Sequence, residues 1–123
     1  RAVAALHAGW RGAASGVLER GIDVMVSSFS SRPGDLLVHL GPAICGTCYE
    51  VGPEVFEALN QEVPAGPEPI DLRRVLAARA VRSGVRDARI SVSAHCTKCT
   101  DSGLFSHRAG HGERQAGFIG VRR

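Results

Sequence analysis

The stretch Ala2-Val3-Ala4-Ala5-Leu6-His7-Ala8-Gly9-Trp10-Arg11-Gly12 decides the fold at sequence level. Its apolar run over residues 2–6 predicts a short buried strand, and the glycines that follow predict a tight turn. Apolar residues then recur every three to four positions from Ala13 to Phe29, which predicts an amphipathic helix. A second apolar run at 36–40 predicts a parallel strand reached by a right-handed crossover.

The rest of the chain continues to alternate helices and strands. Pro53 favours a helix start, and that helix should run to about Asn60. Asp71 is a good N-cap and Gly84 a good stop for a helix over 72–83. Strands are expected at 89–94 and 116–121, and the proline-rich segment 61–69 is expected to be a surface connection. The length and this mixture of helices and strands fit a single domain over residues 1–123.

Composition excludes some functions. The chain has 123 residues, 44% of them hydrophobic, and a formal net charge of +3. Lys98 is the only lysine, and the arginines are scattered rather than clustered, which favours a solvated surface over a nucleic-acid interface. No apolar run reaches the roughly 18 residues that a membrane span needs, and no signal-peptide pattern opens the chain. We expect a cytoplasmic protein with no nucleic-acid or membrane partner.

The turn His7–Gly12 has the parts of an anion site. Gly9 and Gly12 would let the backbone approach a ligand, and Arg11 would add a fork of donors beside a helix N-terminus. His7 can ligate a metal or transfer a proton, and Trp10 can stack on a base or a ribose face. Each residue also has a purely structural interpretation: a strand-end histidine, a core tryptophan and glycines that serve tight packing.

The four cysteines form two Cys-x-x-Cys pairs, Cys45/Cys48 and Cys96/Cys99. Four thiolates are the tetrahedral set that a structural zinc ion prefers. The long separation of the pairs leaves two other interpretations open: ordinary buried or loop cysteines, and redox or catalytic use of one thiol.

Three stretches together resemble one family: His7–Gly12, Gly41–Val51, and the segment from Cys96 through Leu104-Phe-Ser-His-Arg108 to Gly112-Glu-Arg-Gln115. On these motifs the chain is identified as a member of the YfiH-like, or laccase-domain, family. Its members are also called multicopper polyphenol oxidases and peptidoglycan editing factors. The resemblance implies an α+β fold with mixed sheets flanked by helices, similar to the catalytic domain of cytotoxic necrotizing factor.

The resemblance also implies an activity and a metal. Such proteins use one zinc ion, held by two histidines and a cysteine, and cleave adenosine, inosine and methylthioadenosine with phosphate. They also deaminate adenosine to inosine. His7 matches one histidine ligand, whereas the other histidine and the cysteine lie upstream in the family, so none of the four cysteines here is that ligand. The chain resembles the C-terminal half of a longer enzyme, and alone it is expected to be inactive.

Two departures and two alternatives complete the sequence picture. His107 stands where many members have tyrosine, and Ala109-Gly110-His111 replaces a more charged stretch, which bears on substrate preference. A copper-dependent phenol oxidase is the first alternative, although five histidines are few for a multicopper cluster. A non-enzymatic zinc-binding fragment is the second.

Overall fold

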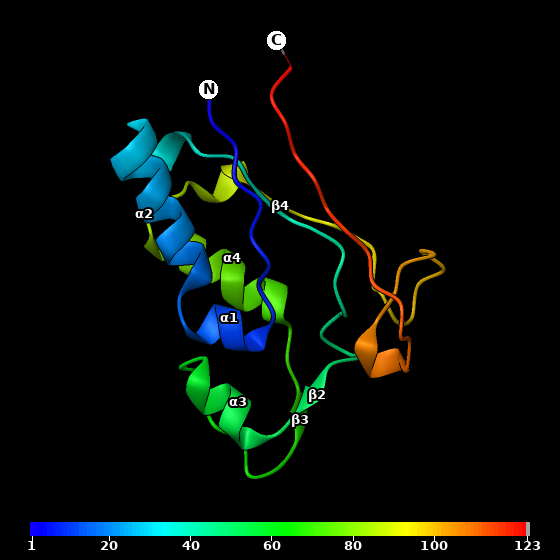
Figure 1. Cartoon of the computed structure of the whole chain (residues 1–123). Coiled ribbons are helices and arrows are strands. Elements are labelled where there is room, and N and C mark those ends of the chain that lie inside the picture. The colour runs from blue at the N-terminus through cyan, green and yellow to red at the C-terminus, as the bar shows by residue number, and fades with distance from the viewer. Residues whose placement is uncertain (123) are drawn as a thin grey trace.

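The structure is a computed structural model, and it describes residues 1–122 (Figure 1). Its helices and strands follow in this order: α1 (Trp10–Ala14), α2 (Val17–Phe29), the 3-10 turn η1 (Pro33–Asp35), β1 (Val38–Leu40), β2 (Glu50–Val51), α3 (Pro53–Ala58), β3 (Glu68–Pro69), α4 (Leu72–Arg82), the 3-10 turn η2 (Asp87–Arg89), β4 (Ile90–Val92) and the 3-10 turn η3 (His107–Ala109).

Two small sheets lie against the helices. In one sheet β1 pairs parallel with β4, with Leu40 opposite Val92; in the other β2 pairs antiparallel with β3. The crossover from β1 to β4 therefore contains β2, α3, β3 and α4. This mixture of helices and small sheets confirms the predicted α+β class.

The helices enclose one apolar core. α4 packs against α2 and also against both strands of the parallel pair. The core residues come from α1, α2, α3 and α4 and the segments between them: Ala13, Leu18, Ile22, Val51, Val55, Phe56, Leu59, Ile70, Leu72, Val75, Leu76, Ala80 and Val85. No helix among residues 1–122 combines the length and apolar character that crossing a membrane requires.

The best-predicted element is α4. The Asp71 side chain accepts a hydrogen bond from the backbone N–H of Arg74 at 3.2 Å, as an N-cap should. Gly84 has a φ of +95° and ends the helix. The helix at Pro53 also forms, over 53–58 rather than 53–60, and the strand expected at 89–94 is shortened to 90–92.

The prediction of one continuous helix over 13–29 is wrong, because the structure has two helices there, α1 and α2. Gly16 takes a left-handed φ of +84°, and the Ser15 hydroxyl donates back to the Gly12 carbonyl at 3.0 Å. These two features separate α1 from α2, and α1 begins three residues earlier than expected, at Trp10. The apolar periodicity runs across the break, so periodicity alone does not reveal it.

The strands predicted at 2–6 and 116–121 are also wrong. Neither segment forms a ladder with any strand among residues 1–122, and Phe118 is 97% exposed. An apolar segment becomes a strand only when a neighbour receives its backbone hydrogen bonds. Residues 2–6 instead run as an extended segment alongside α2 (Figure 1), where the Leu6 side chain packs over Gly21. The parallel crossover expected between 2–6 and 36–40 is therefore replaced by the pairing of β1 with β4.

Candidate functional site

The turn His7–Gly12 is held by close packing around α1. His7 is exposed in the segment before the helix, and Gly9 is the N-cap residue. A Cβ on Gly12 would stand 3.4 Å from the His7 carbonyl oxygen and 3.6 Å from Val17 Cγ1. Gly12 therefore lets α1 lie tightly against the backbone of His7.

Trp10 and Arg11 form one stacked unit. The Arg11 guanidinium lies 4.4 Å from the centre of the Trp10 ring, and the ring itself packs against the apolar core. Such cation–π stacking holds the charged group in place without removing its hydrogen-bond donors. In this arrangement Trp10 orients Arg11, and Arg11 covers the ring face that a base would otherwise use.

Tyr49 and Arg108 join this region, although sequence reasoning assigned neither of them a role. The Arg108 guanidinium lies 5.0 Å from the Tyr49 ring centre and donates to the Glu50 carbonyl. Burial raises the pKa of Tyr49, while the positive charges of Arg108 and Arg11 act in the opposite direction. The signal was present in the sequence, because Tyr49 and Arg108 belong to the second and third motifs.

The third motif is a loop that fixes its own shape. The Phe105 N–H donates to Gln115 Oε1 at 2.8 Å, and Gln115 Nε2 donates to the Phe105 carbonyl at 3.0 Å. The Ser106 N–H donates to His111 Nδ1 at 3.0 Å, and the His111 ring packs edge-on against Phe105. These contacts explain the spacing of the motif, and they hold η3, which carries Arg108.

His7 belongs to no group of three or more potential metal ligands among residues 1–122. Within that range one such group exists. Residues 1–122 therefore bring no complete ligand set together around His7.

The one such group is the four-cysteine cluster of Cys45, Cys48, Cys96 and Cys99. Their four sulfur atoms all lie within 4.8 Å of one another, and Cys45 Sγ stands 3.7 Å from Cys99 Sγ. All four cysteines are free thiols. The cluster ranges from the buried Cys96 to the exposed Cys99. The structure thus brings both predicted pairs together.

The parallel sheet explains why the two pairs meet. Beyond the β1–β4 ladder, Ala43 forms a further parallel bridge with Cys96, and the Thr97 N–H donates to the Ala43 carbonyl at 3.1 Å. Each Cys-x-x-Cys pair therefore lies at the carboxyl end of one of two adjacent parallel strands. Side chains that follow parallel strands gather at one edge, and here the gathered side chains are thiols.

α4 supports both arms of the cluster. The buried Arg73 donates from Nη1 to the carbonyls of Ser93 at 2.8 Å and His95 at 3.1 Å, which fixes the approach to Cys96. On the other arm, a Cβ on Gly46 would stand 2.9 Å from Asp71 Cβ. Glycine is therefore required at position 46 for the first pair to lie against the start of α4.

The sulfur of Cys96 is the acceptor at the centre of the cluster. Backbone N–H groups of Cys45, Lys98 and Cys99 donate to it at 3.2, 3.3 and 3.4 Å. Burial opposes ionisation, but these donors outweigh it and lower the pKa of Cys96 to about 6. The interaction with the Cys96 side chain is the largest of the effects that raise the pKa of Cys99.

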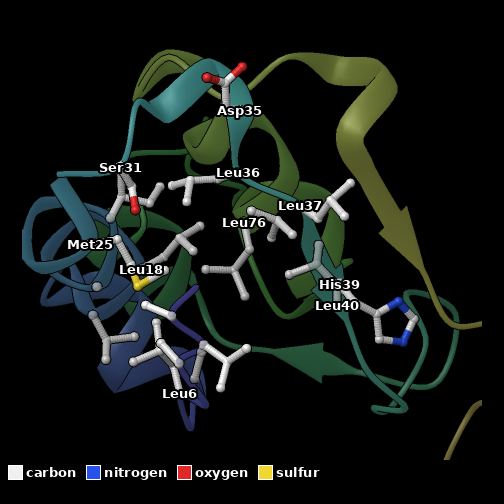
Figure 2. Close-up of a pocket in the computed structure, with 18 of the residues that line it drawn as sticks. Leu6, Leu18, Met25, Ser31, Asp35, Leu36, Leu37, His39, Leu40 and Leu76 are labelled. Atoms are coloured by element: carbon white, nitrogen blue, oxygen red, sulfur yellow. The ribbon is translucent and has the colours of Figure 1, made fainter. Parts of the chain in front are cut away.

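A separate apolar cavity of about 590 Å³ lies between residues 2–8, α2 and the segment leading through β1. Figure 2 shows Leu18, Leu36 and Leu76 turned toward its centre, whereas the ring of His39 points away. None of the predicted site residues lines this cavity. We therefore do not place the functional site there.

Comparison with known proteins defines the class. The family model described as multi-copper polyphenol oxidoreductase laccase matches residues 1–122. Two solved structures share the fold: YlmD from Geobacillus stearothermophilus, with a TM-score of 0.79, and the YfiH protein of Bacillus licheniformis, with 0.77. Each is 31% identical, and they match 88% and 84% of this chain but 44% and 43% of theirs.

Curated relatives point the same way. The chain is 33% identical to purine nucleoside phosphorylase YlmD of G. stearothermophilus, over 94% of this chain and 47% of the relative. It is 36% identical to adenosine deaminase RL5 of an unknown prokaryotic organism, over 86% and 44%. The chain therefore spans about half the length of the curated relatives it matches. It belongs to the laccase-like family of the YfiH and YlmD proteins.

Proposed function

We propose that the protein containing this chain is a purine nucleoside phosphorylase that also deaminates adenosine. The observation that carries the proposal is the pair of stacked arginines, Arg11 on Trp10 within the turn that bears His7 and Arg108 on Tyr49. The two relatives named for these activities support the proposal, because their matches cover 94% and 86% of this chain. Residues 1–123 would be one portion of that enzyme.

Phosphorolysis demands a held anion. Phosphate attacks the sugar carbon that bears the purine, and the purine leaves with the bonding electrons through its ring nitrogen. Guanidinium groups bind phosphate through paired N–H donors and stabilise the charge that develops. Arg11, kept in place by Trp10, and Arg108, kept in place by the third-motif loop, would supply these donors from two sides.

The proposed cofactor is zinc, with His7 as the ligand that this chain supplies and the other two ligands outside it. A zinc ion would supply a Lewis acid for phosphorolysis and would activate water for deamination. The proposed partners are a purine nucleoside and phosphate, and the proposed compartment is the cytoplasm, where cysteines stay reduced.

The test is a product assay on the full-length natural protein. Adenosine with phosphate should give adenine and ribose 1-phosphate, and adenosine without phosphate should give inosine, both resolved by chromatography. Arg11→Met and Arg108→Met should each lower phosphorolysis by about 10²–10³-fold, the loss typical of removing one preorganised donor. Arg20→Met is the matched control, because Arg20 is exposed on α2 and should leave the rate unchanged.

The same preparation separates the two alternatives. Stoichiometric copper together with oxidation of a phenol, and no purine product, would replace the proposal by the laccase-like activity. Absence of all three activities in a folded, zinc-loaded protein would leave a binding function. Equal loss of activity in Arg20→Met and Arg11→Met would remove the assigned role of Arg11.

A further inference from the structure

We propose that Cys45, Cys48, Cys96 and Cys99 hold one structural Zn²⁺ ion, at a site distinct from the one His7 is proposed to join. The proposal does not depend on the purine activity. It rests on the geometry of the cluster, on its hydrogen bonds and on the way the surrounding fold is built around it.

The first support is the spacing of the sulfur atoms. Zinc binds thiolate sulfur at about 2.3 Å in a tetrahedron, which places pairs of sulfur atoms about 3.8 Å apart. Cys45 Sγ and Cys99 Sγ are 3.7 Å apart, and all four sulfur atoms fit within 4.8 Å. The sulfur atoms therefore surround a space suited to one ion.

The second support is the set of backbone donors to sulfur. Three N–H groups, from Cys45, Lys98 and Cys99, point at Cys96 Sγ. Donors of this kind hold ligands in place and stabilise their negative charge when a metal binds. One of them, the Cys45 N–H, comes from the opposite Cys-x-x-Cys pair, so the first pair helps to hold the Cys96 sulfur in place.

The third support is the way the fold holds the ligands. The Ala43–Cys96 bridge sets the two pairs side by side, Arg73 fixes the approach to Cys96, and Gly46 fits against Asp71. The Thr100 hydroxyl accepts from the Cys96 N–H at 2.9 Å and closes the second knuckle. This part of the fold positions the thiols before any metal arrives.

The chemistry selects zinc and a structural role. Four thiolates in a tetrahedron suit zinc or iron, and a compact set of this size suits a single ion. All four positions are filled by protein, so no open position remains for a substrate. The ion would join segments 51 residues apart, Cys45 and Cys96, and would fix the ends of β1 and β4 from which Tyr49 and the Arg108 loop extend.

The experiment counts metal in the full-length natural protein, purified under reducing conditions without added metal. We expect Cys96→Ser/Cys99→Ser to contain one zinc ion per chain fewer than the wild type. His7→Ala and His95→Ala should both retain this ion; His95 is the matched control, because it is exposed and directly precedes Cys96. Replacement by Co²⁺ should give thiolate-to-cobalt charge-transfer absorption with the intensity of the four-thiolate site in the wild type and in both histidine variants. The cysteine variant should keep only the weaker absorption of the single cysteine proposed for the His7 site.

A second measurement guards against misfolding of the double variant. In wild-type protein stripped of metal and kept reduced, adding Zn²⁺ should raise the melting temperature and protect the thiols of Cys45, Cys48, Cys96 and Cys99 from alkylation, as located by peptide mapping. Zinc content unchanged by the cysteine substitutions, stoichiometric iron in place of zinc, or four thiols that alkylate freely at saturating zinc would each overturn the proposal. Loss of zinc in His95→Ala would overturn the four-thiolate ligand set. Failure of the phosphorylase assay would leave this result untouched.

Discussion

The turn at His7 and the four-cysteine cluster both lie at the carboxyl side of short apolar segments, but they differ in completeness. The cluster draws all its parts from residues 1–122: four thiols, three backbone donors and two supports from α4. The turn offers one exposed histidine and an arginine, and that histidine joins no group of three or more potential metal ligands among the described residues. Comparing them teaches that a motif can identify a family without containing a whole site.

The two regions also differ in how they are held. The cluster lies on a parallel pair of strands, whereas the turn depends on α1, a helix of five residues. So short a helix has little stability of its own, and packing must keep it in place. That packing passes through Arg79 of α4, which is 5% exposed and donates to the carbonyls of Ala13 and Leu59.

The largest expected effect comes from a substitution that loosens the packing of α1 and leaves the four-cysteine cluster unchanged. Arg79→Met removes one donor from each of two buried carbonyls, at about 1–3 kcal/mol each, so the free energy of unfolding should fall by about 2–6 kcal/mol in a urea titration. The Ala13 carbonyl keeps the Gly16 N–H as a donor, and the Leu59 carbonyl keeps Gln61 Nε2. Its ion pair with the half-exposed Glu19 adds little to this figure. Zinc bound per folded chain should not change, because no cysteine contacts Arg79.

Arg82→Met is the control for this experiment, since Arg82 is exposed one turn further along α4. An Arg82→Met protein as unstable as Arg79→Met would assign the effect to helix charge and not to the buried carbonyls. Loss of zinc from folded Arg79→Met would show that the two regions are not independent.

Features set by neighbouring residues could be predicted from the sequence, whereas features set by contacts between distant segments could not. The α4 helix was predictable because Asp71 and Gly84 act within a few residues of its ends. The break at Gly16 was missed because one left-handed residue does not disturb an apolar period. Residues 2–6 and 116–121 were predicted as strands because apolar runs report burial and not the presence of a hydrogen-bonding neighbour.

The candidate sites follow the same rule. Two Cys-x-x-Cys pairs indicated a shared metal, yet only the register of β1 against β4, continued by the Ala43–Cys96 bridge, shows that they meet. Likewise, Tyr49 and Arg108 lie within two of the motifs, but the sequence alone indicated no role for either residue. Their contact joins positions 59 residues apart (108 − 49) in the chain, and no local pattern specifies it.

An effect of intermediate size is expected when the support of the four-cysteine cluster by α4 is disturbed. Gly46→Ala forces a Cβ to within 2.9 Å of Asp71 Cβ, so the first cysteine pair must shift away from α4. Overpacking of this kind costs about 1–3 kcal/mol. We expect the affinity for zinc, measured by competition with a chelator, to fall by at least about tenfold, in line with disturbing the supports of a metal site.

Gly41→Ala is the matched control for Gly46→Ala, because a Cβ on Gly41 meets nothing within 4 Å on the same segment. Equal affinity for zinc in Gly46→Ala and the wild type would mean that the first pair is not held by α4. Phosphorolysis by Gly41→Ala should match the wild type, which shows that the segment tolerates a methyl group where space exists.

The smallest expected effect on stability tests the turn itself. Gly12→Ala adds a methyl group 3.4 Å from the His7 carbonyl oxygen, a tight contact that a small shift of α1 would relieve. Alanine also favours the helix by about 1 kcal/mol, so the two effects should nearly cancel and the melting temperature should stay close to that of the wild type. The shift would move Arg11 and His7, however, and the KM for phosphate should rise although the fold is intact.

A melting temperature lowered as far as in Arg79→Met, with KM unchanged, would instead assign Gly12 to packing alone. Since the cluster does not touch α1, its zinc should remain bound either way, and the two regions would then be separable by a single methyl group.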